Sequence, residues 1–217
     1  MRIAIYDLDN TLTRRATFTP FLAFAARRIA PWRLALLPVW VAMMIGYRAG
    51  LYDRTALKTR GMRLMLGKPS LELLREVGEA FAEARAAGSG FMPQVLALLE
   101  EDRASGARLV VATAAFEFYA SAFADRLGID TVIGTRWDGE SIPGGNCYGP
   151  TKLERVRDWA KGEGIDLAAA ELRFVSDSFA DEPLLDLADE PIFVTPSKAK
   201  RERALARGWR VIDGLLG

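Results

Sequence analysis

The chain has 217 residues, half of them hydrophobic, and a formal net charge of +1. This length predicts one domain of ordinary size, or one domain that carries an insertion. The absence of histidine excludes Ser-His-Asp and Cys-His nucleophile systems, histidine-ligated zinc and acid–base catalysis by histidine. The single cysteine, Cys147, excludes an intrachain disulfide. Because this is typical of a reducing compartment, we expect a cytoplasmic protein in which Cys147 is structural.

The first dozen residues combine a short apolar run with two carboxylates. Residues 2–6 (Arg-Ile-Ala-Ile-Tyr) predict a buried strand. Asp7 and Asp9 follow at once, where a signal peptide would be apolar. An isolated carboxylate is costly out of water, so we expect the strand to deliver both acids to the carboxyl edge of a sheet, where open α/β folds bind ligands. The alternative is an Asx-turn with a helix cap at Thr11 or Thr13.

The segment from residue 14 to residue 69 concentrates positive charge. It holds eleven of the 29 Lys and Arg residues but one of the 28 acids, Asp53, which gives it a net charge of +10. The rest of the chain, with 18 bases and 27 acids, has a net charge of −9. This segregation predicts a separate module with an anionic partner of its own.

The same segment is strongly apolar. Residues 18–47 predict helices interrupted at Pro20, Pro31 and Pro38, and residues 34–47 carry no charge. As a helix, this run would span roughly 21 Å, short of the roughly 30 Å hydrocarbon core, so a membrane role would be that of an interfacial helix with Arg, Trp and Tyr at its flanks. The alternative is a helical subdomain that buries this face internally.

Strands and helices alternate in the remainder of the chain. Residues 52–66 and 70–86 predict two more helices, and Gly88-Ser89-Gly90 predicts a break after them. Beyond it we expect strands over 107–112, 130–135, 172–176, 191–195 and 209–213, an irregular flap over 136–148, and helices over 93–104, 116–127, 150–161, from 183 and over 198–207. This alternation predicts an α/β fold with a parallel sheet and right-handed crossovers.

Polar residues stand at the ends of three predicted strands. All the strand ends of a parallel sheet lie at one edge, so we expect one site formed by Asp7, Asp9, Thr113, Asp177 and Asp181, with Lys152 from the start of a helix. Carboxylates gathered there repel one another unless a cation lies among them, and oxygen ligands of this kind suit Mg²⁺.

Each of these residues also has an ordinary structural interpretation. Thr113 could cap a turn, Lys152 could be a solvated helix lysine, and Asp177 and Asp181 could be carboxylates stabilised by a helix dipole. Their coincidence at successive strand ends favours a shared site over four unrelated roles.

Four stretches resemble, in order, the four motifs of the haloacid dehalogenase (HAD) superfamily. They are residues 7–13 (DLDNTLT), residues 110–115 (VVATAA), Lys152 and residues 176–181 (SDSFAD). The insertion between the first two resembles the helical cap of the phosphoserine phosphatase-like branch, subfamily IB. Residues 145–149 (GNCYG) resemble a bacterial subgroup of that branch that includes phosphatidylglycerophosphate phosphatases.

The resemblance implies a Rossmann-like core over residues 1–13 and 89–217 with an all-helical cap over residues 14–88. It also implies roles for the site residues. Asp7 would be the nucleophile that forms an aspartyl phosphate, and Asp9 the general acid and then the general base. Mg²⁺ would be held by Asp7, the Asp9 backbone carbonyl and Asp177. Asp181 would orient Lys152 or a metal-bound water, and Thr113 and Lys152 would bind phosphoryl oxygens.

The sequence departs from the amino-acid phosphatases of this branch in the residues that contact substrate. Ala114 and Ala115 follow the second motif where glycines are usual, and Ala16 stands where phosphoserine phosphatases have an acid that contacts the amino group. Arg60 resembles their carboxylate-binding arginine, so it is the candidate for substrate binding. Without the acid, phosphoserine is a poor fit.

We therefore expect a Mg²⁺-dependent phosphomonoester phosphatase whose substrate is an anionic lipid phosphate such as phosphatidylglycerophosphate. The cap would make peripheral contact with the inner face of the membrane. One alternative is a soluble small-metabolite phosphatase. Another is a catalytically silent protein that binds lipid or nucleic acid; the intact motifs argue against silence, and the long apolar run argues against a nucleic-acid partner.

Overall fold

One six-stranded sheet forms the centre of the molecule. The computed structural model describes residues 1–87 and 90–214, and its strands are all parallel, in the order β3-β2-β1-β4-β5-β6. Their bounds are β1 Arg2–Tyr6, β2 Arg108–Phe116, β3 Thr131–Thr135, β4 Glu171–Ser176, β5 Glu190–Val194 and β6 Arg210–Ile212. The predicted α/β fold with a Rossmann-like parallel sheet is confirmed. Strand β1 lies inside the sheet, where the strand order changes direction, which is where such folds bind ligands.

The helices fill the connections that the alternating pattern predicted. Their bounds are α1 Phe18–Ile29, α2 Leu37–Arg48, α3 Arg54–Leu66, α4 Leu71–Ala86, α5 Pro93–Ala104, α6 Glu117–Arg126, α7 Pro150–Gly162, α8 Glu182–Leu185 and α9 Lys198–Leu205. Side chains that accept a backbone hydrogen bond, namely those of Asp53, Ser70 and Ser197, cap α3, α4 and α9.

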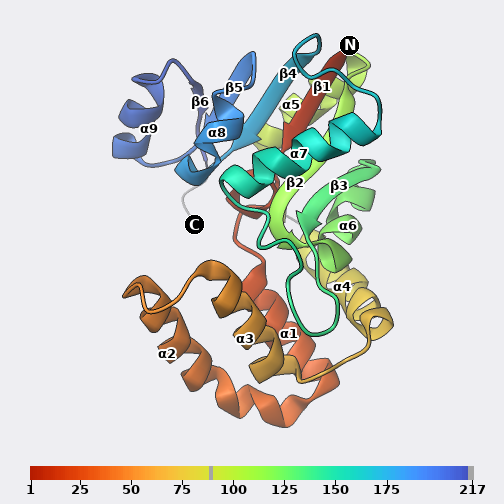
Figure 1. The fold of residues 1–217 in the computed structure, drawn as a ribbon, viewed down its shortest axis with the longest axis vertical. Helices are drawn as coiled ribbons and strands as arrows, with labels where there is room; N and C mark the ends of the chain where they lie inside the picture. The colour runs from red at the N-terminus through yellow and green to blue at the C-terminus, as the bar shows by residue number, and fades with distance from the viewer. Residues whose placement is uncertain (88–89, 215–217) are drawn as a thin grey trace.

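Alternation along β1 divides the core into two layers. Ala4 and Tyr6 pack in the layer that contains residues of α4, α5 and α6, whereas Ile3 and Ile5 pack in the layer that contains residues of α7, α8 and α9. Figure 1 shows α7 and α5 on opposite faces of the sheet. Because both faces are covered, β1 is apolar along its whole length after Arg2, as expected of a strand in a parallel sheet.

Helices α1, α2 and α3, which we call the cap helices, lie beyond the carboxyl ends of the strands (Figure 1). Helix α4 packs instead against α6, beside the sheet. The segments that connect the cap helices to the core run side by side, since Thr13 forms an antiparallel bridge with Phe91. The division of the chain at residues 13/14 and 88/89 stays a prediction, and residues 88 and 89 of the predicted Gly88-Ser89-Gly90 break lie outside the described residues.

The predicted interruptions at Pro31 and Pro38 are confirmed, so the charge-free run of residues 34–47 does not form one helix, whereas the predicted interruption at Pro20 is wrong because Pro20 lies in the first turn of α1. A 3₁₀ helix over Pro31–Leu36 precedes α2, which begins at Leu37 with Pro38 in its first turn. The reason is that proline lacks an N–H and its ring excludes a continuous α-helix through this position, whereas it fits the first turn well.

The alternative of an internally buried apolar run is confirmed for one side of α2 only: Leu37, Met43, Met44 and Tyr47 pack, partly buried, against the core, whereas the other side is exposed. Trp40 is the one buried residue of this fully described helix, and it packs so closely on α3 that a Cβ added at Gly61 would lie 2.6 Å from the indole ring. Five large apolar residues of this region are exposed, and we call them the α2 apolar surface: Trp32, Val39, Val41, Ile45 and Leu51. In the described parts of the chain, no helix is long and apolar enough to cross a bilayer.

Candidate active site

Asp7 stands where β1 leaves the sheet. Its backbone N–H donates to the Val175 carbonyl of β4 at 2.9 Å, which extends the β1–β4 ladder by one residue, and its side chain is buried. The chain then turns sharply over Leu8–Leu12, where Asn10 has a φ of 56°. Asparagine tolerates this left-handed conformation better than most residues. The turn thus places Asp9 next to the strand end and starts the path toward the cap helices.

Lys152 joins two carboxylates from different strand ends. Its Nζ lies 2.7 Å from Asp7 Oδ1 and 2.6 Å from Asp181 Oδ2, and all three side chains are buried. Ser176 at the end of β4 donates a second hydrogen bond to Asp181 Oδ2 at 2.7 Å. Gly149, with a φ of 61°, turns the chain into α7 immediately before Lys152. The structure therefore brings Asp7, Lys152 and Asp181 together, as the sequence predicts.

This cluster carries more negative than positive charge. Burial raises the pKa of Asp7 to about 8; Lys152 opposes the rise, whereas Asp181 and Asp177 add to it. Burial likewise raises the pKa of Asp177 to about 6, against the attraction of Lys200. Burial disfavours the charged form of Lys152, but the Asp181 and Asp7 carboxylates outweigh it and raise its pKa. An additional cation among these carboxylates would therefore be stabilised.

Asp9 is held by the start of the cap. Its Oδ1 accepts hydrogen bonds from the Thr17 backbone N–H at 2.8 Å and the Thr17 hydroxyl at 2.7 Å. Thr17 is fully buried and also lies within hydrogen-bonding distance of the Tyr119 hydroxyl. Among the described residues, Asp9 Oδ2 has no such partner, so one carboxylate oxygen is fixed and the other is available. Thr17 carries no motif signal that could have identified it.

Thr113 and Arg60 are not placed as predicted. Strand β2 continues through Thr113 to Phe116, although its register with β3 shifts between Ala112 and Phe116. The buried Thr113 hydroxyl accepts from the Ala115 N–H at 3.0 Å, the geometry of a turn cap. Arg60 is exposed and lies over the Tyr52 ring. It points away because it is two residues, more than half a helical turn, from the Lys58 position that faces the core.

A cavity of about 420 Å³, which we call the aspartate cavity, opens beside these acids. It brings together Asp7, Asp9, Lys152, Asp177 and Asp181. Ala16 and Ala114, which the sequence analysis placed at substrate-contacting positions, line it as well. Its other lining residues were not predicted as site residues: Asn10, Arg54, Tyr148, Ser178, Phe179, Ala180 and Lys200. Arg54 lies 3.9 Å from the centre of the Tyr148 ring, so the flap and α3 meet at this cavity. Its cations and buried acids suit a phosphorylated ligand.

The acids suit Mg²⁺ better than a metal that needs many protein ligands. In residues 1–87 and 90–214, no three His, Cys, Asp or Glu side chains gather closely enough to hold a metal by themselves. Mg²⁺ usually binds one or two carboxylates, keeps several waters and shares phosphate oxygens. Asp7 and Asp177 in one cavity meet that requirement, and Asp181 Oδ1 is buried without a partner among the described residues.

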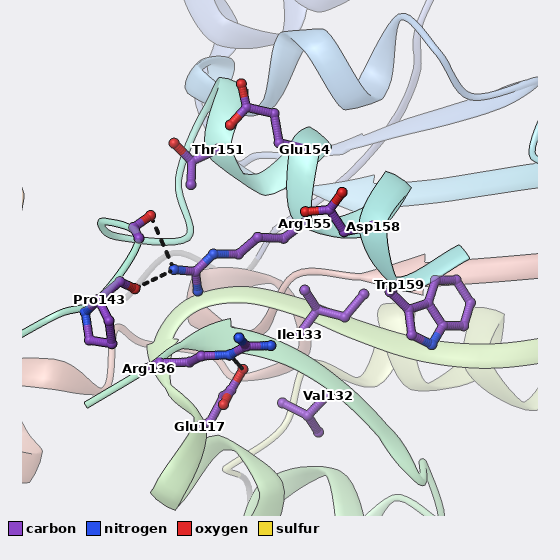
Figure 2. A pocket seen from close by; sticks show the side chains of 11 residues that line it. Glu117, Val132, Ile133, Arg136, Pro143, Thr151, Glu154, Arg155, Asp158 and Trp159 are labelled. Atoms are coloured by element: carbon purple, nitrogen blue, oxygen red, sulfur yellow. Dashed lines mark hydrogen bonds and ion pairs between the residues drawn. The ribbon is translucent and has the colours of Figure 1, made fainter. Parts of the chain in front are cut away.

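A larger cavity, of about 580 Å³, lies between β3, the flap and α7 but contains none of the predicted site residues (Figure 2). Its two guanidinium groups are already engaged. Arg155 donates to the carbonyls of Gly134 and of flap residues 143–145, and Arg136 lies 3.7 Å from Glu117. The aspartate cavity is therefore the better candidate for chemistry.

Comparison with known proteins identifies the family. A family model described as haloacid dehalogenase-like hydrolase matches residues 4–186, which include Asp7, Asp9, Lys152, Asp177 and Asp181. The chain belongs to this hydrolase family. The HAD hydrolase is 32% identical to protein CicA of Caulobacter vibrioides over 87% of this chain and 83% of that protein. A 34% identical match to the inhibition of morphological differentiation protein of Streptomyces azureus spans 45% of that protein.

Further similarities connect this HAD hydrolase to phosphatases. Phosphoserine phosphatase SerB1 of Mycobacterium tuberculosis is 26% identical over 97% of this chain and 70% of that protein. A Bordetella pertussis protein of unknown function has a similar structure, with a TM-score of 0.85, 29% identity and 99% of each chain covered. A phosphoserine phosphatase structure with a phospho-aspartyl intermediate analogue shares the fold, with a TM-score of 0.59 and 15% identity over 99% of this chain and 93% of that one. The family makes this chain a hydrolase, and its relatives include proteins named as phosphatases.

The Lys152 ion pairs generate a prediction about stability. Lys152→Met leaves two carboxylates buried without their cation, so in the presence of a chelator the free energy of unfolding at pH 8 should fall by about 3 kcal/mol. Lys152 opposes the rise of the Asp7 pKa, so losing the lysine raises that pKa further in the folded state. Stability should therefore recover as the pH falls from that pKa toward 5, because the neutral Asp7 carboxyl is easier to bury. Urea denaturation at several pH values measures this.

Lys161→Met provides the matched control, since Lys161 is exposed on the same helix. Its free energy of unfolding should stay within about 0.5 kcal/mol of the wild type at every pH. Equal stability of Lys152→Met and wild type at pH 8 would show that the ion pairs do not stabilise the fold.

Proposed function

We propose that this phosphatase hydrolyses phosphomonoesters with Mg²⁺ through an aspartyl phosphate on Asp7. The observation that carries the proposal is the contact of one buried lysine with two buried acids at the edge of the sheet. A lysine there restrains the Asp7 carboxylate and offers a positive charge to phosphoryl oxygens. Without such charge, an anionic nucleophile would be repelled by the anionic phosphate.

Asp7 would attack phosphorus as the ester oxygen leaves, so that an acyl phosphate forms on Asp7 and an alkoxide is released. Asp9 would give its proton to that alkoxide and later take one from water, which attacks phosphorus and regenerates Asp7 with release of inorganic phosphate. The hydrogen bonds from Thr17 would hold Asp9 in place for both transfers. Lys152 would stabilise the oxygens of the phosphoryl group throughout.

When bound, Mg²⁺ would be held by the Asp7 and Asp177 carboxylates and the Asp9 carbonyl and would offset charge on the phosphoryl group. Asp181 would keep Lys152 oriented through its 2.6 Å contact. The Thr113 hydroxyl accepts from the Ala115 N–H and keeps its own proton to donate to a phosphoryl oxygen. Lys200 lines the cavity and supplies a further positive charge for phosphate.

The substrate that fits best is an anionic, partly apolar phosphate such as phosphatidylglycerophosphate. Ala16 lines the aspartate cavity and offers no acid to an amino group, which disfavours phosphoserine. A soluble metabolite remains the second candidate because relatives include proteins named phosphoserine phosphatase and, over 56% of this chain, a histidinol-phosphatase of Neisseria meningitidis. A phosphatase screen with phosphatidylglycerophosphate, phosphoserine and histidinol phosphate distinguishes the lipid-phosphate substrate from a soluble metabolite.

The α2 apolar surface supports peripheral contact with an anionic membrane. Its exposed apolar side chains are accompanied by basic residues that the structure leaves accessible: Arg27, Arg28, Arg48, Arg60 and Arg63. Amphipathic surfaces of this composition bind the interface through apolar insertion and attraction to anionic lipids. A phosphatase docked this way would meet lipid substrates directly, without crossing the bilayer.

The proposed role of Asp7 as nucleophile generates a prediction about turnover. Asp7→Asn should lower turnover by at least about 10³-fold while circular dichroism stays that of the wild type, because the amide is not a nucleophile. Asp9→Asn should slow the hydrolysis of alkyl phosphates far more than that of an aryl phosphate, because an aryl leaving group needs no proton. Wild-type turnover in Asp7→Asn would exclude the covalent mechanism.

The proposed Mg²⁺ site generates a prediction about the metal dependence of turnover. Chelation should abolish turnover and added Mg²⁺ should restore it, because the buried carboxylates otherwise repel the substrate. Ca²⁺ should bind yet support little turnover, since its higher and looser coordination misplaces the nucleophile. Full activity of the metal-free protein would contradict the proposal.

The proposed membrane contact generates a prediction about binding to lipid vesicles. The protein should sediment with anionic vesicles at low salt and retain part of that binding at high salt, because roughly 1 kcal/mol per basic residue is screened while apolar insertion is not. Ile45→Asp should remove the salt-resistant part, and neutral vesicles provide the control. Protein left in the supernatant with anionic vesicles at low salt would rule out the contact.

A further inference from the structure

A second cavity, of about 470 Å³, adjoins the aspartate cavity, and we call it the cap groove. The two share four lining residues: Asp9, Ala16, Arg54 and Ala114. Two of the four are alanines, so beside Ala16 and Ala114 the boundary between the cavities carries nothing larger than a methyl group, whereas Arg54 and Asp9 line the rest of it. A ligand whose phosphate contacts Asp7 can therefore extend past Ala16 and Ala114 into the cap groove.

The walls of the cap groove are mostly apolar. Helix α1 contributes Phe18, α2 contributes Trp40, Met44 and Ile45, and α3 contributes Leu57. Ile45 also belongs to the α2 apolar surface, as does Val41, which lines the groove as well. The groove is thus continuous at one end with the site of chemistry and at the other with exposed apolar side chains.

Charged side chains also line this groove, namely Asp9, Arg48, Arg54 and Lys58. Lys58 Nζ donates to the Ala114 carbonyl and, at 2.9 Å, to Asn146 Oδ1. Burial lowers the pKa of Lys58 to about 7, with Asp9 opposing the change. Since Ala114 lines both cavities, the ammonium lies at the inner end of the groove, and its two hydrogen bonds compensate its burial. Away from that end the apolar residues of α2 form the wall, together with the exposed Arg48.

We propose that the cap groove binds the apolar part of the substrate's leaving group, so that the enzyme selects phosphomonoesters of alcohols that carry a hydrocarbon chain. The proposal rests on the proposed function and deepens it, because substrate specificity then depends on the cap groove and not on docking of the protein to a bilayer. It also gives the alanines at positions 16 and 114 a role. Larger or acidic side chains there would obstruct the chain or leave a charge beside it.

Hydrolysis of n-alkyl phosphates from ethyl to octyl tests the proposal. All are used below their aggregation concentrations and without vesicles, so that membrane docking contributes nothing. We expect kcat/KM to rise about fourfold for each buried methylene, the fold-change equivalent to about 0.8 kcal/mol, until the chain reaches the mouth of the groove. Most of the rise should lie in KM, because the chain is bound equally in the ground and transition states.

Two matched variants locate the effect. Val41 and Val39 lie on α2 and are each 48% exposed, but only Val41 lines the groove. Val41→Asn should lower the octyl-to-ethyl ratio of kcat/KM by about fivefold, since an amide would face the chain, and Val39→Asn should leave the ratio unchanged. Met44→Gln, deeper in the helix packing, should lower the ratio as well and replaces Val41→Asn if that variant does not fold.

The outcomes separate the two proposals. Equal kcat/KM values for ethyl and octyl phosphate would overturn the proposal that the groove binds the hydrocarbon chain, and would leave the proposed phosphatase chemistry intact. Equal effects of Val41→Asn and Val39→Asn would also overturn it, because both residues belong to the α2 apolar surface. If neither an alkyl nor an aryl phosphate is hydrolysed with Mg²⁺ present, the proposed function itself fails.

Discussion

The contact of Lys152 with Asp7 and Asp181 is the constraint on which the site depends. Three buried charges are stable only when they compensate one another, so the end of β1, the turn after β4 and the first turn of α7 must all be in place. The same requirement restricts Asp7 to one position relative to a phosphate. Packing of the sheet and reactivity of the carboxylate are therefore linked through a single ammonium group.

The cap helices complete what the sheet edge begins. Thr17, at the start of α1, fixes one oxygen of Asp9, and Arg54 and Lys58, four residues apart on one face of α3, bring positive charge to the two cavities. Helix α2 adds the apolar wall and leaves the opposite residues in solvent. One short helical module thus supplies an acid–base support, cations and an apolar surface, which explains its unusual combination of basic and hydrophobic residues.

Much of this arrangement could be predicted from the sequence, because strand ends of a parallel sheet must converge. Asp7, Asp9, Asp177 and Asp181 follow apolar runs directly, and the site lies where those runs end. The family resemblance points to Arg60, whereas Arg54, six residues earlier on α3, lines the cavity; which face of α3 reaches the site depends on how that helix packs against the core, which a local pattern does not determine. For Thr113 the sequence left two interpretations open, a turn cap and a phosphate ligand, and the hydrogen bond from the Ala115 N–H matches the turn cap.

Covalent catalysis at Asp7 is most directly tested by trapping the intermediate. The enzyme is mixed with a fast aryl phosphate and Mg²⁺, quenched in acid within the first turnover and digested, and the N-terminal peptides are analysed by mass spectrometry. We expect the mass of one phosphoryl group on Asp7, lost on treatment with hydroxylamine and absent from Asp7→Asn. Rapid turnover with Asp7 unmodified at every quench time, or a phosphoryl group on another residue, would contradict nucleophilic attack by Asp7.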